Sequence, residues 1–319
     1  MTKALITGIS GFAGSFLAEY LISLKKYKVS GTYLVSGSLK NLSSVKDNLE
    51  LTQVDLINQE GIEQLIERER PDVIFHLAAL PGVGSSFDKP AETIINNVAA
   101  QVHLLEAIRK AELFDCRILV VSSADVYGKI AKEDLPIDEE TKFYPSSSYA
   151  VSKITQDFLG LQYFLSYNMK IIRARPFNHV GPRQSSGFVI ADFAQKIAKI
   201  EKGLQEPILN VGNLEARRDF TDVRDMVRAY ELLISLGKTG DVYNIGYGKS
   251  YKISKILQMF LSITRVKITI RKDQSLLRPQ DLLERVCDNS KFVKLTGWKP
   301  EITLEQTLKD TLDYWRDIV

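Results

Sequence analysis

A tyrosine and a lysine stand four residues apart near the middle of the chain, at Tyr149 and Lys153. On a helix this spacing places both side chains on one face. An ammonium group beside a phenol favours the phenolate, so Lys153 is expected to lower the pKa of Tyr149. A phenol with a lowered pKa can pass a proton to or from a carbonyl or alcohol oxygen. The same spacing occurs by chance in many helices, so this chemistry needs support from other parts of the chain.

A pair of serines supplies a further polar group. Ser122 and Ser123 end the apolar segment 117–123, which is typical of a buried strand. Doubly wound sheets bind ligands at the carboxyl ends of their strands, so Ser123 is placed to hydrogen-bond a substrate oxygen beside Tyr149. The alternative for either serine is a buried hydroxyl bonded to the backbone, and Ser122 suits that role better.

The chain opens with a glycine-rich loop between a predicted strand and a predicted helix. The loop contains Gly8, Gly11 and Gly14 and follows the apolar run 3–7. Glycines let the backbone approach a pyrophosphate, and the helix N-terminus offers amide donors and a partial positive charge. We therefore expect a dinucleotide cofactor here, in preference to a plain glycine turn.

The residues that would face the adenosine leave the choice between NADP and NAD open. No acidic residue stands at 32–34, at the end of the second predicted strand, where it would bind the ribose 2′-hydroxyl and favour NAD. Lys40 could meet the 2′-phosphate of NADP but lies beyond this strand. Asp55 ends the third predicted strand, where it either accepts from the adenine amine or caps a helix. The sequence thus predicts NADP or NAD.

Strands and helices alternate through the first 176 residues. Strands are predicted at 3–7, 28–34, 50–55, 71–77, 117–123 and 169–175, with helices between them. This alternation predicts an α/β fold with a doubly wound parallel Rossmann sheet. We expect residues 1–176 to form the NAD(P)-binding domain, with a return of the chain at about 211–236. Residues 177–319 are expected to form mainly a smaller C-terminal α/β lobe.

Composition and charge exclude several classes of protein. The 319 residues are 45% hydrophobic and 25% charged, as in ordinary globular enzymes. The net charge of +3 predicts no nucleic-acid partner. No signal peptide is evident, and no apolar run reaches the ~18 residues that span a membrane. The two cysteines and three histidines show no metal-ligand spacing, so we expect a cytoplasmic protein with reduced thiols and no metal.

Arginines gather in the second half of the chain. Residues 215–228 contain four arginines and four acidic residues, so most of these charges neutralise one another. A further arginine, Arg278, precedes a proline. Guanidinium groups match the geometry of diphosphates, so one or two of these arginines are expected to face a ligand.

Taken together, these segments resemble the extended short-chain dehydrogenase/reductase family that acts on nucleotide sugars, over essentially the whole chain. The motifs that carry the resemblance are Gly8-x-x-Gly11-x-x-Gly14, His76-Leu77-Ala78-Ala79, Asn96-Asn97-Val98, Ser122-Ser123-Ala124-Asp125-Val126-Tyr127-Gly128 and Tyr149-x-x-x-Lys153. Segments 175–182, 187–194, 212–225 and 278–281 are most similar to the subgroup that reduces GDP-4-keto-6-deoxy-D-mannose. The resemblance implies NAD(P)H-dependent reduction of the C4 ketone of this GDP-linked sugar, which yields GDP-D-rhamnose.

The resemblance also implies roles for individual residues. The implied catalytic residues are Ser123, Tyr149 and Lys153. Cofactor binding is implied for Tyr149 and Lys153 and for Gly8, Gly11, Phe12, Ala13, Gly14, Asp55, Leu56, Leu77, Ala78 and Ala79. Substrate binding is implied for Ser123, Asp125, Asn178, Val189, Arg218 and Arg278. Relatives pair through two long helices, which implies a homodimer through 91–111 and 148–167, with apolar contacts from Leu159, Leu161, Phe164 and Leu165.

Three other activities remain open. A GDP-mannose 4,6-dehydratase needs a further acid/base group, which in related dehydratases is a glutamate, often with an adjacent aspartate, just after the catalytic serine or threonine. This chain has Ala124 and Asp125 there; the first cannot transfer a proton and the second is one methylene shorter than glutamate. A nucleotide-sugar 4-epimerase would use the same catalytic residues as a reductase. A cofactor-binding regulator without turnover is disfavoured, because the catalytic set is intact.

Overall fold

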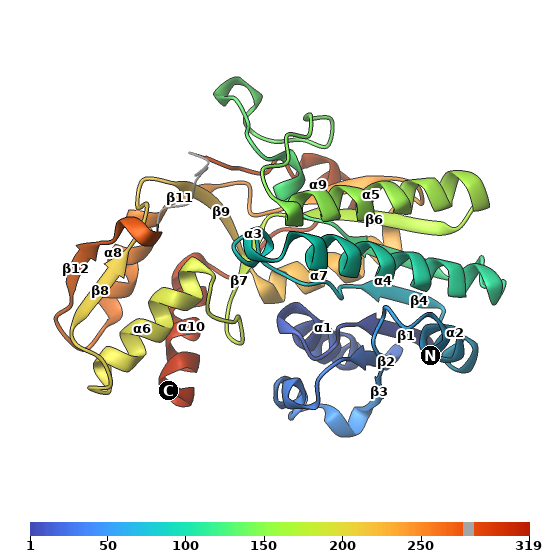
Figure 1. The fold of residues 1–319 in the computed structure, drawn as a ribbon, viewed down its shortest axis with the longest axis horizontal. Helices are drawn as coiled ribbons and strands as arrows, with labels where there is room; N and C mark the ends of the chain where they lie inside the picture. Colours follow the sequence, from blue (N-terminus) through green and yellow to red (C-terminus); the bar gives the residue numbers. More distant parts are fainter. Residues whose placement is uncertain (277–283) are drawn as a thin grey trace.

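A seven-stranded parallel sheet forms the centre of the larger part of the molecule (Figure 1). The computed structural model describes residues 1–276 and 284–319. The strand order is β10-β6-β5-β4-β1-β2-β3, and each neighbouring pair is parallel. The order reverses between β1 and β4, and doubly wound sheets bind their ligands at such a point. The predicted α/β Rossmann fold is confirmed.

The strands of this sheet are short and separated by helices. They are β1 Thr2–Thr7, β2 Tyr27–Tyr33, β3 Leu49–Gln53, β4 Val73–His76, β5 Arg117–Val121, β6 Lys170–Pro176 and β10 Val242–Ile245. The helices that accompany them are α1 Phe12–Ser23, α2 Gln59–Glu69, α3 Ser85–Asp88, α4 Pro90–Lys110, α5 Ser148–Tyr167, α7 Val223–Leu236 and α9 Ser290–Thr296. Short 3₁₀ helices cover Ser36–Leu42, Lys46–Asn48, Ala124–Tyr127, Lys132–Asp134 and Gln274–Leu276.

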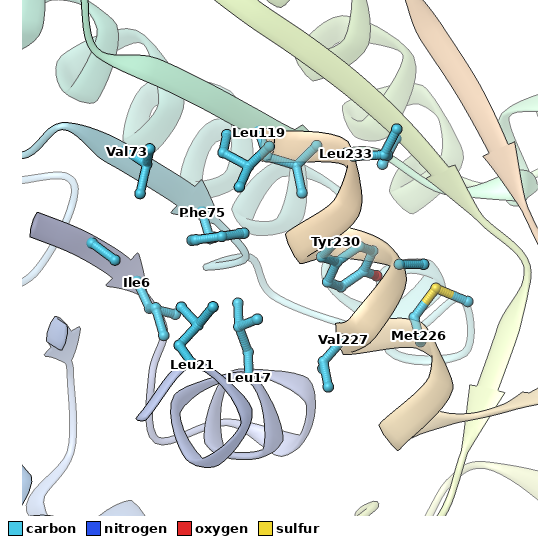
Figure 2. Packing of buried hydrophobic residues seen from close by; sticks show 14 of the residues in the cluster. Ile6, Leu17, Leu21, Val73, Phe75, Leu119, Met226, Val227, Tyr230 and Leu233 are labelled. Atoms are coloured by element: carbon cyan, nitrogen blue, oxygen red, sulfur yellow. The ribbon is translucent and has the colours of Figure 1, made fainter. Parts of the chain in front are cut away.

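Helices cover both faces of the sheet because successive strand residues point to opposite sides. Ile6 of β1 packs with Leu17 of α1 and Tyr230 of α7 in one buried cluster, part of which Figure 2 shows. Leu5, the preceding residue, belongs to a second cluster with residues of α2 and α4, among them Ile108. The sheet is therefore buried on both faces, as its near-continuous apolar strands predict.

A smaller lobe lies beside the sheet, on the left in Figure 1. Its strands are β7 Asn178–Val180, β8 Ile208–Val211, β9 Arg217–Asp222, β11 Ser250–Lys252 and β12 Thr269–Lys272. They form a three-stranded sheet, β11-β9-β7, and a pair, β12-β8. Its helices are α6 Val189–Glu201, α8 Ile253–Ile263 and α10 Leu304–Ile318, which share one buried cluster.

The chain crosses between the two parts more than once. After β9 it returns to the large sheet, where α7 packs beside α1 and β10 adds a strand next to β6. It then builds β11 to β12 of the smaller lobe and returns again as α9, whose Phe292 joins the cluster of α1 and α7. None of the helices in the described residues is long and apolar enough to cross a membrane.

Candidate active site

The glycine-rich loop is shaped by close contacts that exclude side chains. Gly8 has a φ of +73°, and a Cβ there would lie 3.1 Å from the Cα of Ala78. A Cβ on Gly14 would lie 2.3 Å from the carbonyl oxygen of Gly8. The loop after β1, the start of α1 and the loop after β4 therefore lie against one another through backbone alone.

The N-terminus of α1 is suited to an anion. Gly11 is the N-cap residue, no side chain caps the helix, and its first turn contains no acidic residue. The amide groups of the first turn are therefore available to a phosphate, which the helix dipole also favours. Phe12 and Ala13 begin this helix, and the Phe12 ring stacks on His179 at 5.8 Å between ring centroids. These residues fit the pyrophosphate of a dinucleotide.

The other residues predicted for the cofactor follow the ends of β3 and β4. Leu77, Ala78 and Ala79 follow β4, and the amide of Ala78 donates to Oγ1 of Thr7, the last residue of β1, at 3.2 Å. Thr7 pairs with His76 across the two strands. The loops after β1 and β4 are thus joined at one edge of the sheet.

Asp55 lies beyond β3 with an exposed side chain, and its Oδ1 accepts from the amide of Ile57 at 3.1 Å. Asn58, not Asp55, caps α2, because its side chain accepts from the amide of Gly61. The alternative role of Asp55 as a helix cap is therefore wrong. Its neighbour Leu56 is buried.

The two serines after β5 have different surroundings. Ser122 is buried and its hydroxyl donates to the carbonyl of Lys153 at 3.0 Å, which confirms its predicted structural role. Ser123 caps the 3₁₀ turn 124–127, since its Oγ accepts from the amide of Asp125 at 3.1 Å. Its side chain also lies beside Tyr149, since Ser123 lowers the pKa of that phenol. The structure thus brings together Ser123 and Tyr149, which the sequence places 26 residues apart.

Helix α5 carries Tyr149 and Lys153 one turn apart, as their spacing predicts. Ser147 caps the helix by accepting from the amide of Ala150 at 3.1 Å. The Lys153 ammonium is buried, donates to the carbonyl of Val121 at 2.9 Å, and lies 5.9 Å from the centroid of the Tyr149 ring. The cap fixes the residue at which the helix begins. The hydrogen bond to Val121, the last residue of β5, then places the Lys153 ammonium at the end of that strand.

The pKa of Tyr149 differs from the expectation. Burial, followed by the negative charge of Asp125, raises this pKa, and the neighbouring Ser123 hydroxyl opposes the rise only in part. Burial also lowers the pKa of Lys153 to about 7, so this lysine is only partly charged at neutral pH. The expected lowering of the Tyr149 pKa by Lys153 is therefore not found, because desolvation outweighs the attraction of a distant and partly neutral amine. Tyr149 is protonated at neutral pH.

An amide side chain on α4 joins the cofactor loop to the catalytic helix. Oδ1 of Asn97 accepts from the amide of Leu80 at 2.7 Å, and its Nδ2 donates to Oγ of Ser152 at 3.0 Å. Ser152 in turn donates to the carbonyl of Tyr149 at 2.8 Å. Asn97 therefore holds the loop after β4 in register with the residues that precede Lys153 on α5.

The predicted substrate-binding residues lie on several elements. Asn178 is half-buried on β7 and pairs with Phe220 of β9. Arg218, two residues earlier on β9, is half-buried and donates from Nη1 to the carbonyl of Arg217 at 2.8 Å. Val189 begins α6 and is half-buried. Arg278 lies outside the described residues.

Sequence patterns did not indicate one residue of this site, Arg285. Its guanidinium forms an ion pair with Asp125, so it lies close to Ser123. The two partners are 160 positions apart, and no local pattern connects them. The only sequence signal that could have pointed to Arg285 is its place near Arg278, an arginine that was predicted to bind the substrate. In residues 1–276 and 284–319 no cluster of His, Cys, Asp and Glu is arranged to hold a metal ion.

Comparison with known proteins agrees with this geometry. The GDP-mannose 4,6 dehydratase family matches residues 5–311. The GDP-6-deoxy-D-mannose reductase of Pseudomonas aeruginosa is 36% identical, with 100% of this chain and 99% of that protein aligned. The GDP-mannose 4,6-dehydratase of Yersinia enterocolitica is 29% identical over 96% of this chain and 91% of that protein.

Solved structures show the same similarity. The structure of RMD from Pseudomonas aeruginosa complexed with NADPH superposes with a TM-score of 0.88 at 34% identity, over 100% of both chains. The UDP-glucose 4-epimerase of Thermus thermophilus, in complex with NAD, gives a TM-score of 0.89 at 26% identity over 100% of both chains. With its glycine loop, serine and Tyr-Lys pair at one edge of the sheet, this chain belongs to the GDP-mannose 4,6 dehydratase family of extended short-chain dehydrogenases/reductases.

Proposed function

We propose that the protein reduces the C4 ketone of GDP-4-keto-6-deoxy-D-mannose to GDP-D-rhamnose with NADPH. The observation that carries this proposal is the placement of a buried, protonated Tyr149 hydroxyl beside Ser123, just after β5. A phenol with a raised pKa is a proton donor at neutral pH, which is the form that a ketone reduction requires. The similarity to GDP-6-deoxy-D-mannose reductase over the whole chain supports this substrate.

The residues of the site then have separate tasks. When bound, the reduced nicotinamide supplies the hydride. Ser123 donates a hydrogen bond to the C4 oxygen of the sugar, and Tyr149 gives its proton to the same oxygen as the carbonyl becomes an alkoxide. Lys153 holds the nicotinamide ribose, as the family resemblance implies, and when protonated it favours the phenolate that Tyr149 leaves behind.

NADPH is proposed as the preferred cofactor on two grounds. The second strand, β2, ends without an acidic residue to bind a ribose 2′-hydroxyl. The similar RMD structure of Pseudomonas aeruginosa is complexed with NADPH. NADH remains the alternative, since no described contact assigns a partner to the 2′-phosphate.

We also propose a division of labour between the two parts of the molecule. Residues 1–176, with the returning α7 and β10, would hold the cofactor, because the glycine loop and the catalytic helix lie there. The smaller lobe would hold the GDP-linked sugar through Asn178, Val189, Arg218 and Arg278. The arginines would pair with the diphosphate.

Dehydration of GDP-mannose is the second candidate, since relatives with this name cover nearly the whole chain. Its mechanism begins with oxidation at C4, a step that Tyr149 and Lys153 would serve equally well. It also needs a carboxyl group that exchanges protons, whereas the carboxylate of Asp125 is held by Arg285. This ion pair favours the reductase. Epimerisation would likewise begin by oxidation.

A homodimer through α4 and α5 is part of the proposal. Val151, Phe158 and Leu165 recur every seven residues along α5 and are 41%, 50% and 70% exposed, and Ile95 of α4 is 63% exposed. Residues seven apart form one stripe on a helix, so an apolar stripe faces outward. Of the other side chains predicted for this contact, Leu159, Leu161 and Phe164 are half-buried.

Cytoplasmic location stays a prediction.

Oxidation of NADPH on addition of GDP-4-keto-6-deoxy-D-mannose tests the function. The wild type is expected to oxidise one NADPH for each GDP-D-rhamnose formed, with the product identified by mass spectrometry. Tyr149→Phe is the matched variant: it removes only the proton donor, so turnover should fall by about 10²-fold or more while NADPH still binds. Water loss from GDP-mannose without added reductant would instead establish the dehydratase.

A further inference from the structure

A partly buried ion pair lies beside the catalytic serine and tyrosine. Nη1 of Arg285 donates to Oδ1 of Asp125. The side chains of these two residues are 9% and 23% exposed. The main-chain amide of Arg285 also donates to the carbonyl of Arg217, at 3.2 Å. The arginine is therefore anchored through its backbone to β9, while its guanidinium reaches across to the end of β5.

The carboxylate of Asp125 also contacts the catalytic serine. Oγ of Ser123 donates to Oδ2 of Asp125 at 3.3 Å, while accepting from the Asp125 amide at 3.1 Å. A serine hydroxyl has a single proton to donate. A stronger bond from Ser123 to this carboxylate would withdraw that proton from a substrate oxygen. A positive partner on the other carboxylate oxygen weakens this competition, because it already compensates the negative charge.

We infer that Arg285 is a positioning residue for the proposed reduction, one that acts through Asp125. By holding this carboxylate, it leaves the hydroxyl proton of Ser123 available to the C4 oxygen and balances a negative charge next to the Tyr149 hydroxyl. The inference rests on the proposed function and adds to it a residue that tunes the proton donor. It assigns Asp125 the role of a compensated charge and not that of an acid/base group.

The groups around Tyr149 lie on several elements. Asp125, in the 3₁₀ turn, raises the pKa of Tyr149. Tyr230 of α7 interacts electrostatically with Tyr149 and is itself protonated, since burial raises its pKa. Lys153 lies on the same helix as Tyr149. His76 of β4 is neutral, because burial and the charge of Lys153 lower the pKa of His76 to about 3. Of these neighbours, Asp125 is the one that carries a negative charge at neutral pH.

Arg285→Met tests the inference in the reverse reaction, the oxidation of GDP-D-rhamnose with NADP, because this direction needs the phenolate of Tyr149 as base. Without Arg285, the uncompensated charge of Asp125 disfavours the phenolate, so the pH at which kcat rises moves upward. At neutral pH kcat should fall roughly tenfold, with a smaller change in KM. In Asp125→Asn the pH profile should move downward. The double variant should return towards the wild-type profile.

Two further variants act as controls. Arg285→Lys keeps the charge, so its pH profile should stay close to that of the wild type even if kcat falls. Arg217→Met removes the neighbouring ion pair with Glu284, whose Oε1 lies 2.9 Å from Arg217 Nε. It should leave the pH profile in place, which separates loss of charge at Asp125 from loosening of the loop.

The inference is overturned if folded Arg285→Met keeps the wild-type pH profile, or if the double variant is as slow as Arg285→Met. Should Arg285→Met fail to fold, Asp125→Asn still tests the inference. If the pH profile of kcat in Asp125→Asn does not move downward, the role inferred for the charge of Asp125 is contradicted. A wild type that turns over neither substrate overturns the proposed function and this inference together. A wild type that turns over, with variants that do not shift, overturns the inference alone.

Discussion

At the scale of single residues, the catalytic chemistry depends on the free energy needed to bury the ionised form of each side chain. Tyr149 and Lys153 stand one helical turn apart, yet burial raises the pKa of the first and lowers that of the second. Both shifts favour the neutral form, which is the effect of desolvation and not of mutual attraction. The site therefore begins with a protonated phenol, as suits a reductase.

Lys153→Met is expected to abolish a pH-dependence of stability. The pKa of Lys153 falls from 10.5 to about 7 on folding, so between these pH values the unfolded chain binds more protons than the folded one. Wild-type stability, relative to that of the variant, should rise with pH in this window by up to about 1.4 kcal/mol per pH unit. Below about pH 7 the buried Lys153 is charged and destabilises the folded protein fully, and above pH 10.5 this destabilisation is gone.

Urea unfolding of both proteins at several pH values inside this window measures the difference. Equal pH-dependence of the two unfolding free energies would show that Lys153 is not desolvated in the folded protein. Activity should be lost in the variant at every pH, because the partner of Tyr149 is missing.

At the scale of elements, the loop between β1 and α1 requires glycine for steric reasons. A Cβ on Gly14 would meet the carbonyl oxygen of Gly8 at 2.3 Å and the Cα of Ile9 at 2.9 Å, and backbone atoms cannot move aside as a flexible side chain can. The close approach of helix to loop is what directs the first-turn amides of α1 to the cofactor.

Gly14→Ala should therefore destabilise the protein by about 1–3 kcal/mol and weaken NADPH binding. Gly84→Ala is the matched control. Gly84 has helical dihedral angles, φ −59° and ψ −56°, and open space around its Cβ position. This control should be neutral or stabilising by about 0.4–1 kcal/mol. Thermal unfolding and fluorescence titration with NADPH would measure both effects, and wild-type binding by Gly14→Ala would contradict the steric argument.

At the scale of the whole molecule, two covered faces and one uncovered stripe define the architecture. The sheet is buried between α1 and α7 on one side and α2, α4 and α5 on the other. Phe158 and Leu165 remain exposed on the outer side of α5. An exposed apolar stripe along a helix is typical of a contact with another protein, and the twofold pairing proposed above would bury it.

The double variant Phe158→Glu with Leu165→Glu should be a monomer. In the dimer, the introduced carboxylates of the two subunits would repel one another and would be buried away from water at a cost in free energy. Light scattering after size-exclusion chromatography gives the mass directly, and the wild type should have twice the mass of the variant. Leu204→Glu, at a 65% exposed position after α6, is the control and should remain a dimer. A monomeric wild type would refute the proposed pairing.

The sequence by itself determined the parts of this protein that depend on neighbours close in the chain. Apolar runs and helical periodicity predicted the strands and helices around the large sheet, and glycine spacing predicted the loop at Gly8. The spacing of Tyr149 and Lys153 predicted a shared helix face. The short strands β7, β9 and β11 were not predicted, because three to six residues of mixed polarity carry little periodic signal.

Only the tertiary structure decided what depends on contacts between distant segments. Residues 242–245 fall within the range 177–319 that was expected to form mainly the smaller lobe, yet they are the edge strand of the large sheet because they pair with β6. The ion pair of Arg285 with Asp125 joins residues 160 positions apart. The direction of the Tyr149 pKa shift also belongs here, since desolvation is produced by all the elements that exclude water from the phenol, and no spacing along the chain measures that.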